Sequence, residues 1–134
     1  YRDLLSGLSS EELKEKIGKA SKIKGITDKL DDYFDGNLAA INSIKVRQPG
    51  AAFSQAAWSS MREIKAGTME SYSDLAYRAG SPAAVRAAGS ACAKNKIAII
   101  IPCHRIIKSD GSIGAYGWGV NMKMWLLRHE GAID

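Results

Sequence analysis

An aliphatic run, Ile97 to Ile101, followed at once by Pro102-Cys103-His104-Arg105, is the feature that most constrains this fold. A run rich in β-branched residues at this length predicts a buried β-strand. Proline has no N–H to give to a sheet ladder, so the strand should end at Pro102. A thiol, an imidazole and a guanidinium then stand at the mouth of a rigid strand, where a nucleophile is well placed. These residue types are equally consistent with a core cysteine beside a surface histidine.

Length and cysteine content are those of a small reduced domain. The chain has 134 residues, begins without a methionine and fits one domain or one domain with a fragment of another. We expect no membrane span and no secretory signal, because no apolar run is long enough. Two cysteines are too few for a disulfide scaffold, and with two histidines they form no zinc pattern. The sequence predicts an intracellular monomer, cytoplasmic or nuclear (nucleoid-associated in a prokaryote), without a metal or a cofactor.

Positive charge is concentrated in the part of the chain that holds the Cys-His pair. Residues 1 to 40 carry eight acidic and seven basic side chains, a net charge of −1, whereas residues 41 to 134 carry six and twelve, a net charge of +6. A basic surface favours phosphate groups through counterion release. A soluble basic domain that binds no nucleic acid would show the same balance, so charge alone leaves both interpretations open.

Helical patterns occupy most of the chain. They predict helices over residues 11 to 17, between Thr27 and Gly36, between Phe53 and Gly67, and from Met122 to about His129. The expected caps of three of these helices are Ser9 or Ser10, Thr27 and Asn121. The residues expected to face the core are Leu30, Tyr33, Phe34, Trp125, Leu126 and Leu127, with Trp58 on the flank of its helix. Residues 41 to 47 form a short strand or an extended connector.

A helix-turn-helix pattern precedes the aliphatic run. Ser71 or Ser73 opens the first helix, and Gly80 ends it. Ser81 caps the second helix, which has a proline at its first position and runs from Ala83 to about Lys94.

The second helix is rich in small residues, and Arg86 projects from its middle. Such a helix either packs tightly on a neighbouring helix or lays its bare face close to DNA. Reading bases in the major groove would need several Arg, Lys, Asn or Gln side chains, which this helix lacks. If it contacts DNA, it therefore suits the minor groove of a duplex, with little sequence preference. The candidate DNA-contacting residues are Ser81, Ala84, Arg86, Ala87, Ala88 and Gly89.

With its surroundings, the Pro102-Cys103-His104-Arg105 motif resembles the active site of the O6-alkylguanine-DNA alkyltransferases. The resemblance is firmest from residue 50 to the end of the chain. The matching residues, in family order and at family-like spacing, are Gly50, Phe53, Trp58, Ser71-Tyr72, Gly80 to Arg86, Asn95, Tyr116, Lys123, Leu126-Leu127 and Glu130-Gly131. Lys96 stands where the family usually has proline. Asp32 to Gly36 resembles the end of the family's N-terminal subdomain, but too little chain precedes it to build that subdomain's sheet.

The resemblance implies a mixed α/β fold. We expect a mostly helical C-terminal domain with a winged-helix-like helix-turn-helix and a short strand that carries the nucleophile. This DNA-binding alkyltransferase domain should span residues 48 to 134, after a variable and truncated N-terminal region over residues 1 to 47.

The resemblance also implies a single-turnover DNA repair methyltransferase that flips the damaged nucleotide. Cys103 takes a methyl or other small alkyl group irreversibly from O6 of guanine, with O4 of thymine as a further candidate donor. His104 is the general base, acting through a water, and Glu130 holds its imidazole. Tyr72 faces N3 of the guanine, and Asn95 is a hinge that holds the helix-turn-helix against the active-site turn. A base is required because a free thiol, with a pKa of about 8.5, is mostly protonated at neutral pH.

Recognition of the flipped base falls to the segment after the nucleophile. The predicted pocket residues are Ile106, Tyr116, Gly117, Trp118 and Lys123. Tyr116 and Trp118 form walls, backbone N–H groups near Gly117 face O6, and the carbonyl group of Ile106 accepts from the exocyclic amine. Arg86 takes the place of the flipped base in the stack. The bulk of Trp118 predicts slower reaction with benzyl than with methyl adducts.

Other functions remain open at this point. The chain could be a non-catalytic sensor of alkyl lesions. It could also be the transferase domain of an adaptive-response regulator, because Gly117-Trp118-Gly119 resembles a loop of that subgroup. A Cys-His hydrolase would need an oxyanion hole and a peptide-sized cleft, and it would leave Arg86 unexplained. Cys92 is expected to be a packed helix residue, because no base adjoins it, and the sequence does not tell whether it accepts alkyl groups.

Overall fold

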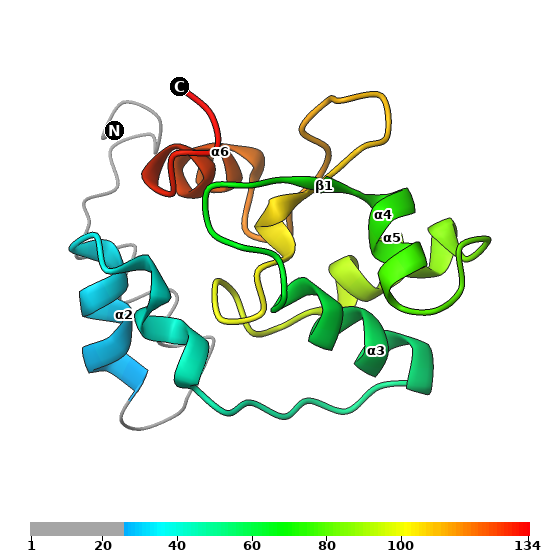
Figure 1. Cartoon of the computed structure of the whole chain (residues 1–134), viewed down its shortest axis with the longest axis horizontal. Helices are drawn as coiled ribbons and strands as arrows, with labels where there is room; N and C mark the ends of the chain where they lie inside the picture. Colours follow the sequence, from blue (N-terminus) through cyan, green and yellow to red (C-terminus); the bar gives the residue numbers. More distant parts are fainter. Residues whose placement is uncertain (1–25) are drawn as a thin grey trace.

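The computed structural model describes residues 26 to 134, so the helix expected over residues 11 to 17 lies outside the described residues. The elements in chain order are α2 (Ile26–Phe34), the 3-10 helix η2 (Leu38–Ser43), α3 (Ala52–Met61), β1 (Glu70–Ser71), α4 (Tyr72–Arg78), α5 (Val85–Lys94), the 3-10 helix η3 (Cys103–Arg105), β2 (Ile106–Ile107) and α6 (Val120–His129). Figure 1 shows α2 and α6 on one side, α3, α4 and α5 on the other, and η3 (gold) between them. The mostly helical, mixed fold class is confirmed. Within the described chain, no helix has the length and apolar character needed to cross a bilayer.

A short parallel ladder joins two parts of the chain that are far apart in sequence. β1 and β2 form a two-stranded sheet in which Ser71 lies opposite Ile107. Tyr72 follows β1 directly, and Cys103 lies on η3 just before β2, so the ladder brings both residues to the same region. The side chain of Ser71 accepts from the Asp74 N–H, and the Asp74 carboxylate accepts from the Ser71 N–H, which fixes the start of α4.

The run Ile97 to Ile101 is buried, but the expectation that it forms a strand is wrong. It folds as a tight turn in which the Ile101 N–H donates to the Ile97 carbonyl at 3.2 Å, and Ile99 has a φ of 68°. A left-handed φ is unfavourable for a β-branched residue, so the packed surroundings must hold this turn. The Asn95 side chain takes the place of a neighbouring strand. Its amide donates to the Ile101 carbonyl at 3.0 Å, and its oxygen accepts from the Ile97 N–H at 3.1 Å.

Several expected helix boundaries are also corrected. Both α2 and α6 begin one residue before the cap expected for them, so Thr27 and Asn121 lie inside first turns. Ser81 does not cap α5, because its carbonyl accepts from the Ala84 N–H at 2.9 Å in a separate turn, and the helix begins after that turn. The third helix, α3, ends at Met61, earlier than expected.

Trp58 joins α3 to α5 and is not on the flank of its helix. Its ring is buried, and its indole N–H donates to the Ala91 carbonyl at 2.9 Å. The connector that follows η2 passes close to this ring at Gly50, where an added Cβ would lie 2.6 Å from a ring carbon. Only glycine permits this approach, and residues 44 to 51 are an extended connector with no strand partner among the described residues.

Candidate active site

Cys103 lies on the single turn of η3, between the buried turn that precedes it and β2. Its backbone N–H donates to the Ile101 carbonyl at 2.8 Å, and only 4% of the residue is exposed. The same turn carries His104 and Arg105, both buried. The thiol lines a pocket, whereas the imidazole and the guanidinium both reach Glu130.

Glu130, at the end of α6, accepts hydrogen bonds from the buried polar groups behind the thiol. Its Oε2 lies 2.8 Å from His104 Nε2 and accepts from the Tyr33 hydroxyl at 2.6 Å. Arg105 donates to both carboxylate oxygens at 2.9 Å, and its third donor reaches the Ile64 carbonyl at 2.6 Å. The carboxylate therefore receives four donors, which come from two segments of the chain, α2 and η3.

The protonation states of this network follow from its burial and pairing. Burial alone would raise the pKa of Glu130, but the adjacent His104 and Arg105 outweigh it and hold that pKa far below its ordinary value. Burial lowers the pKa of His104, despite the opposing attraction of Glu130. Since an ionised carboxylate only accepts hydrogen bonds, His104 Nε2 must carry the proton. The other ring nitrogen, Nδ1, is then the acceptor of a neutral imidazole, and it is buried without a partner among the described residues.

The thiol itself is held by Asn95, and the Lys123 ammonium acts on it electrostatically. The Asn95 amide lies 3.3 Å from Sγ as a donor. Burial raises the pKa of Cys103, while the Asn95 hydrogen bond and the nearby Lys123 ammonium oppose that rise. At neutral pH the thiol is consequently protonated, and an external base is needed to make it a strong nucleophile.

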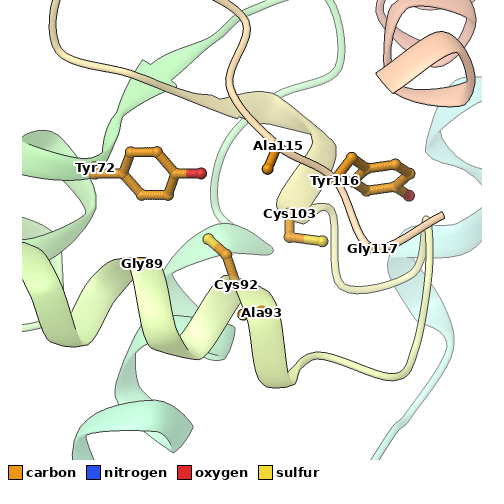
Figure 2. Close-up of a pocket in the computed structure, with 8 residues that line it drawn as sticks. All are labelled: Tyr72, Gly89, Cys92, Ala93, Cys103, Ala115, Tyr116 and Gly117. Carbon is orange, nitrogen blue, oxygen red and sulfur yellow. The ribbon is translucent and has the colours of Figure 1, made fainter. Parts of the chain in front are cut away.

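A cavity of about 260 Å³ opens in front of the thiol (Figure 2). The residues that line it are Tyr72, Gly89, Cys92, Ala93, Cys103, Ala115, Tyr116 and Gly117. Figure 2 shows the Tyr72 hydroxyl pointing into it from one side, α5 forming its floor and the segment from Ala115 to Gly117 crossing the opposite side. Burial raises the pKa of Tyr72, so its phenol is a proton donor at neutral pH.

The remaining predicted pocket residues do not line the cavity. Trp118 packs on Tyr116, with ring centroids 5.2 Å apart, and so supports the wall from behind. The Lys123 ammonium is buried and donates to the Ile106 carbonyl at 2.6 Å, with the Ala115 carbonyl at 3.4 Å. Lys123 therefore ties β2 to the loop that forms the pocket wall.

The predicted DNA-contacting residues divide into two groups. Arg86 is exposed on α5, and Ser81, Ala84, Ala87 and Gly89 are half-buried. Ala88 is fully buried in the core, so the expectation that it contacts DNA is wrong. Helical periodicity turns this position toward the molecule's interior, where α5 packs closely on α3 and α4. The small residues of α5 thus serve both the packing and the exposed face.

Two residues of the site were not expected from the sequence. Tyr33 was placed only on the apolar face of its helix, and Gln48 was not singled out. Cys92 packs against the core as expected, and it also lines the pocket. Gln48 donates to the Asn95 oxygen at 2.8 Å and accepts from the Lys96 N–H at 3.1 Å. The only signal in the sequence was that the side chains of Tyr33 and Gln48 each end in a polar group, which needs a hydrogen-bond partner when it is buried. The sequence does not indicate which residue that partner is.

Fold and site together define a class: a helix-turn-helix domain with a buried thiol in a pocket, backed by a paired histidine and glutamate. The family model described as "6-O-methylguanine DNA methyltransferase, DNA binding domain" matches residues 52–132. A methylated-DNA–protein-cysteine methyltransferase of Salmonella typhimurium is 41% identical over 135 residues, covering 98% of this chain and 78% of the relative. This chain belongs to the methylated-DNA–protein-cysteine methyltransferase family.

Solved structures agree with this assignment. The crystal structure of Mycobacterium tuberculosis O6-methylguanine methyltransferase matches with a TM-score of 0.71 and 39% identity, covering 81% of this chain and 65% of that one. A structure of the Mycobacterium tuberculosis protein in complex with DNA matches with a TM-score of 0.70 and 36% identity. The present chain thus spans just under two thirds of the length of these solved relatives. The family is one of DNA repair methyltransferases with a DNA-binding domain.

Proposed function

We propose that this protein repairs duplex DNA by moving a methyl or other small alkyl group from O6 of guanine to Cys103. The observation that carries the proposal is the position of this thiol. It lies in a pocket of about 260 Å³, and it is adjacent in sequence to a histidine whose free nitrogen is buried. A pocket of this size accepts a flat base, and the tyrosine and the glycine-rich segment around it supply a proton donor and close approach.

The reaction is an in-line displacement. Through a water, His104 Nδ1 takes the thiol proton of Cys103, and the imidazolium is stabilised by Glu130. The thiolate attacks the alkyl carbon, so that an S–C bond forms as the C–O6 bond breaks. Tyr72 supplies a proton at N3, and guanine leaves as a neutral base. The product is a thioether, which no described residue is placed to cleave, so each molecule acts once.

DNA binding positions the lesion. Arg86 is exposed on α5, beside the half-buried Ala87 and Gly89, and Gly89 also lines the pocket. The helix therefore reaches from the surface to the cavity, which suits a minor-groove contact from which a flipped nucleotide enters directly. Flipping the nucleotide out of the base stack costs a few kcal/mol, and the Arg86 side chain fills the space that the nucleotide leaves.

Asn95 is proposed as the hinge between α5 and the active-site turn. Its side chain contacts the thiol, the turn and Gln48 at the same time. The division at residue 47 stays a prediction, and one hydrophobic core includes Leu30 and Ile41 together with the helices that follow. A regulatory role in a larger protein stays open as an alternative to a stand-alone enzyme.

The test is incubation with duplex DNA that carries one O6-methylguanine, followed by intact mass and peptide mapping. We expect a stoichiometric gain of one methylene mass on Cys103, lost in Cys103→Ala. Cys92→Ala is the matched control, because it removes the other thiol of the pocket, and its methyl group should still be found on Cys103. Tight binding to the lesion without a mass gain would overturn transfer and favour a lesion sensor.

A further inference from the structure

The hydroxyl of Tyr33 reaches the carboxylate behind the thiol from the far end of the described chain. Tyr33 is fully buried on α2 and lies 97 positions before Glu130 in sequence. Its hydroxyl donates to Glu130 Oε2 at 2.6 Å, and the same oxygen lies 2.8 Å from His104 Nε2. Arg105 also donates to this oxygen at 2.9 Å, so three donors share it, and one of them is the imidazole proposed as the general base.

The packing of α2 holds this hydroxyl in place. Leu30 and Tyr33 are buried on the same face of the helix. The His129 imidazole on α6 donates to the Tyr33 carbonyl at 2.7 Å, and its ring lies 5.1 Å from the Tyr33 ring. A hydrophobic contact alone would be made equally well by phenylalanine, so the hydroxyl needs its own explanation.

The charged groups around the pair are few. Glu130 is faced by Tyr33, His104 and Arg105, with the Tyr116 phenol at longer range. His104 is faced by Glu130, Arg105 and Lys123 and by the edge of the Tyr116 ring, 6.5 Å away between centroids. Besides the imidazole itself, the described donors to Oε2 are the charged Arg105 guanidinium and the neutral Tyr33 hydroxyl.

We propose that Tyr33 is a positioning residue for the transfer reaction: its hydroxyl shares the charge of Glu130 Oε2 and thereby sets the basicity of His104. This inference rests on the proposed function of His104 as the base for Cys103. A carboxylate oxygen that accepts a hydrogen bond from a phenol stabilises an adjacent imidazolium less than the same oxygen without that bond. The hydroxyl therefore keeps His104 neutral, with a free Nδ1, down to a lower pH.

The closing experiment measures the pH dependence of single-turnover methyl transfer. In Tyr33→Phe the acid limb of the rate profile should move to higher pH by about 0.5 to 1 unit, the amount expected for losing one buried hydrogen bond. Replacing Tyr33 by 3-fluorotyrosine, a stronger donor of nearly the same size, should move the limb to lower pH. Leu30→Val is the matched control, since it loosens the same helix without touching Glu130, and its limb should stay in place.

A second measurement separates this inference from the proposed function. The protonation of His104 is followed by NMR in the free protein, with the signal assigned by comparison with His104→Asn. Its midpoint should rise in Tyr33→Phe, and the increment should vanish in the Glu130→Gln background. An unchanged midpoint in Tyr33→Phe, or equal limb shifts in Leu30→Val, overturns the role of Tyr33. Absence of transfer by the unaltered protein overturns the proposed function instead, and the NMR titration still decides the role of Tyr33.

Discussion

The two sides of Cys103 are built in opposite ways. Behind it, the carboxylate of Glu130 receives four hydrogen bonds from fully or nearly fully buried side chains. In front of it, the pocket is lined by two tyrosines, a second thiol and small residues, and the buried Tyr116 hydroxyl has no partner within residues 26 to 134. Behind the thiol the polar atoms of Glu130 and Arg105 are paired, and only His104 Nδ1 lacks a partner among the described residues. In front of it, by contrast, the Tyr116 hydroxyl is unpaired within that part of the chain and the Tyr72 hydroxyl points into the pocket (Figure 2).

This difference separates positioning from recognition. A general base must be held to within a fraction of an ångström, which a saturated network achieves. A pocket that receives a base from DNA must exchange its own contacts for contacts with that base, so unpaired groups there favour binding. We therefore expect substitutions behind the thiol to change stability first, and substitutions in front to change the reaction first.

Removing the guanidinium behind the thiol should have the largest effect. Arg105→Met leaves Glu130 buried without its bidentate partner and should lower the free energy of unfolding by about 3–5 kcal/mol. Urea unfolding measures this loss. Arg78→Met is the control, because its ion pair with Glu70 is exposed and should be worth at most about 1 kcal/mol. Equal losses in the two variants would contradict the contrast between the network and the surface.

The same network predicts loss of stability in acid. The pKa values of both His104 and Glu130 lie below their ordinary values of 6.5 and 4.5, so the unfolded chain binds protons that the folded protein does not. The stability that these groups contribute is present above those ordinary values. It should fall as the pH drops, first below about 6.5 and further below about 4.5. Urea midpoints measured from pH 8 to pH 4 check the prediction, and midpoints that stay constant across this range would disprove it.

Asn95 stands between the two sides, and its loss should affect both. Asn95→Ala removes the donors to Cys103 Sγ and to the Ile101 carbonyl, and it should cost about 1–3 kcal/mol of stability. It should also raise the pKa of Cys103 further, because this hydrogen bond opposes the effect of burial. The pH dependence of thiol alkylation by iodoacetamide reports that change. Gln48→Ala is the control, since Gln48 touches Asn95 but not the thiol, and it should lower stability alone.

Alanine substitutions at two glycines of the pocket loop, Gly114 and Gly117, should differ in their effect on stability. Only the first position has a left-handed φ and close neighbouring atoms. Gly114 has a φ of +79°, and a Cβ there would lie 3.4 Å from Lys108 Cγ and 3.7 Å from the Tyr72 hydroxyl. Gly114→Ala should therefore cost about 1–2 kcal/mol. In Gly117→Ala the new Cβ meets no atom within 4 Å, and stability should stay within about 0.5 kcal/mol. Thermal unfolding of both variants measures the difference, and similar losses would mean that the loop is strained throughout.

Trp118 should affect the balance between two alkyl substrates more than it affects any other property of the site. It is half-buried and supports Tyr116 rather than lining the cavity. Trp118→Ala frees Tyr116 to move and should raise the rate of inactivation by free O6-benzylguanine, relative to methyl transfer, on the order of tenfold. An unchanged ratio of the two rates would show that Trp118 does not limit the pocket.

The sequence predicted local features better than distant ones. Of the two serines expected to open α4, Ser71 is its cap, and α2, α4, α5 and α6 lie within a few residues of their expected positions. The aliphatic run was misjudged because the groups that satisfy its backbone belong to the side chain of Asn95, and propensity does not count side-chain partners. The left-handed φ of Ile99 is unfavourable for isoleucine, so the turn that contains it is stabilised by packing and not by local backbone preference.

The site shows the same division. The motif around Cys103 and the later Glu130 pointed to groups that the structure brings together, with His104 and Glu130 2.8 Å apart, although their catalytic roles stay predictions. Tyr33 could not be placed, because periodicity identifies a buried face but not which charged group lies against it. Lys123 was assigned to the pocket on resemblance alone, and the structure shows that it joins the carbonyl of Ile106 on β2 to the carbonyl of Ala115 in the pocket loop.

The buried turn from Ile97 to Ile101 also has a consequence for solubility. Five consecutive aliphatic residues without charge are the composition that pairs readily into cross-β assemblies. In the folded protein the Asn95 side chain, braced by Gln48 on the connector, binds the Ile97 N–H and the Ile101 carbonyl, and the turn's own hydrogen bonds occupy the Ile100 and Ile101 N–H groups. If that connector detaches, the run is freed as an unpaired strand that other copies of the chain can match. The side-chain amides of Asn95 and Gln48 therefore contribute to resistance against aggregation.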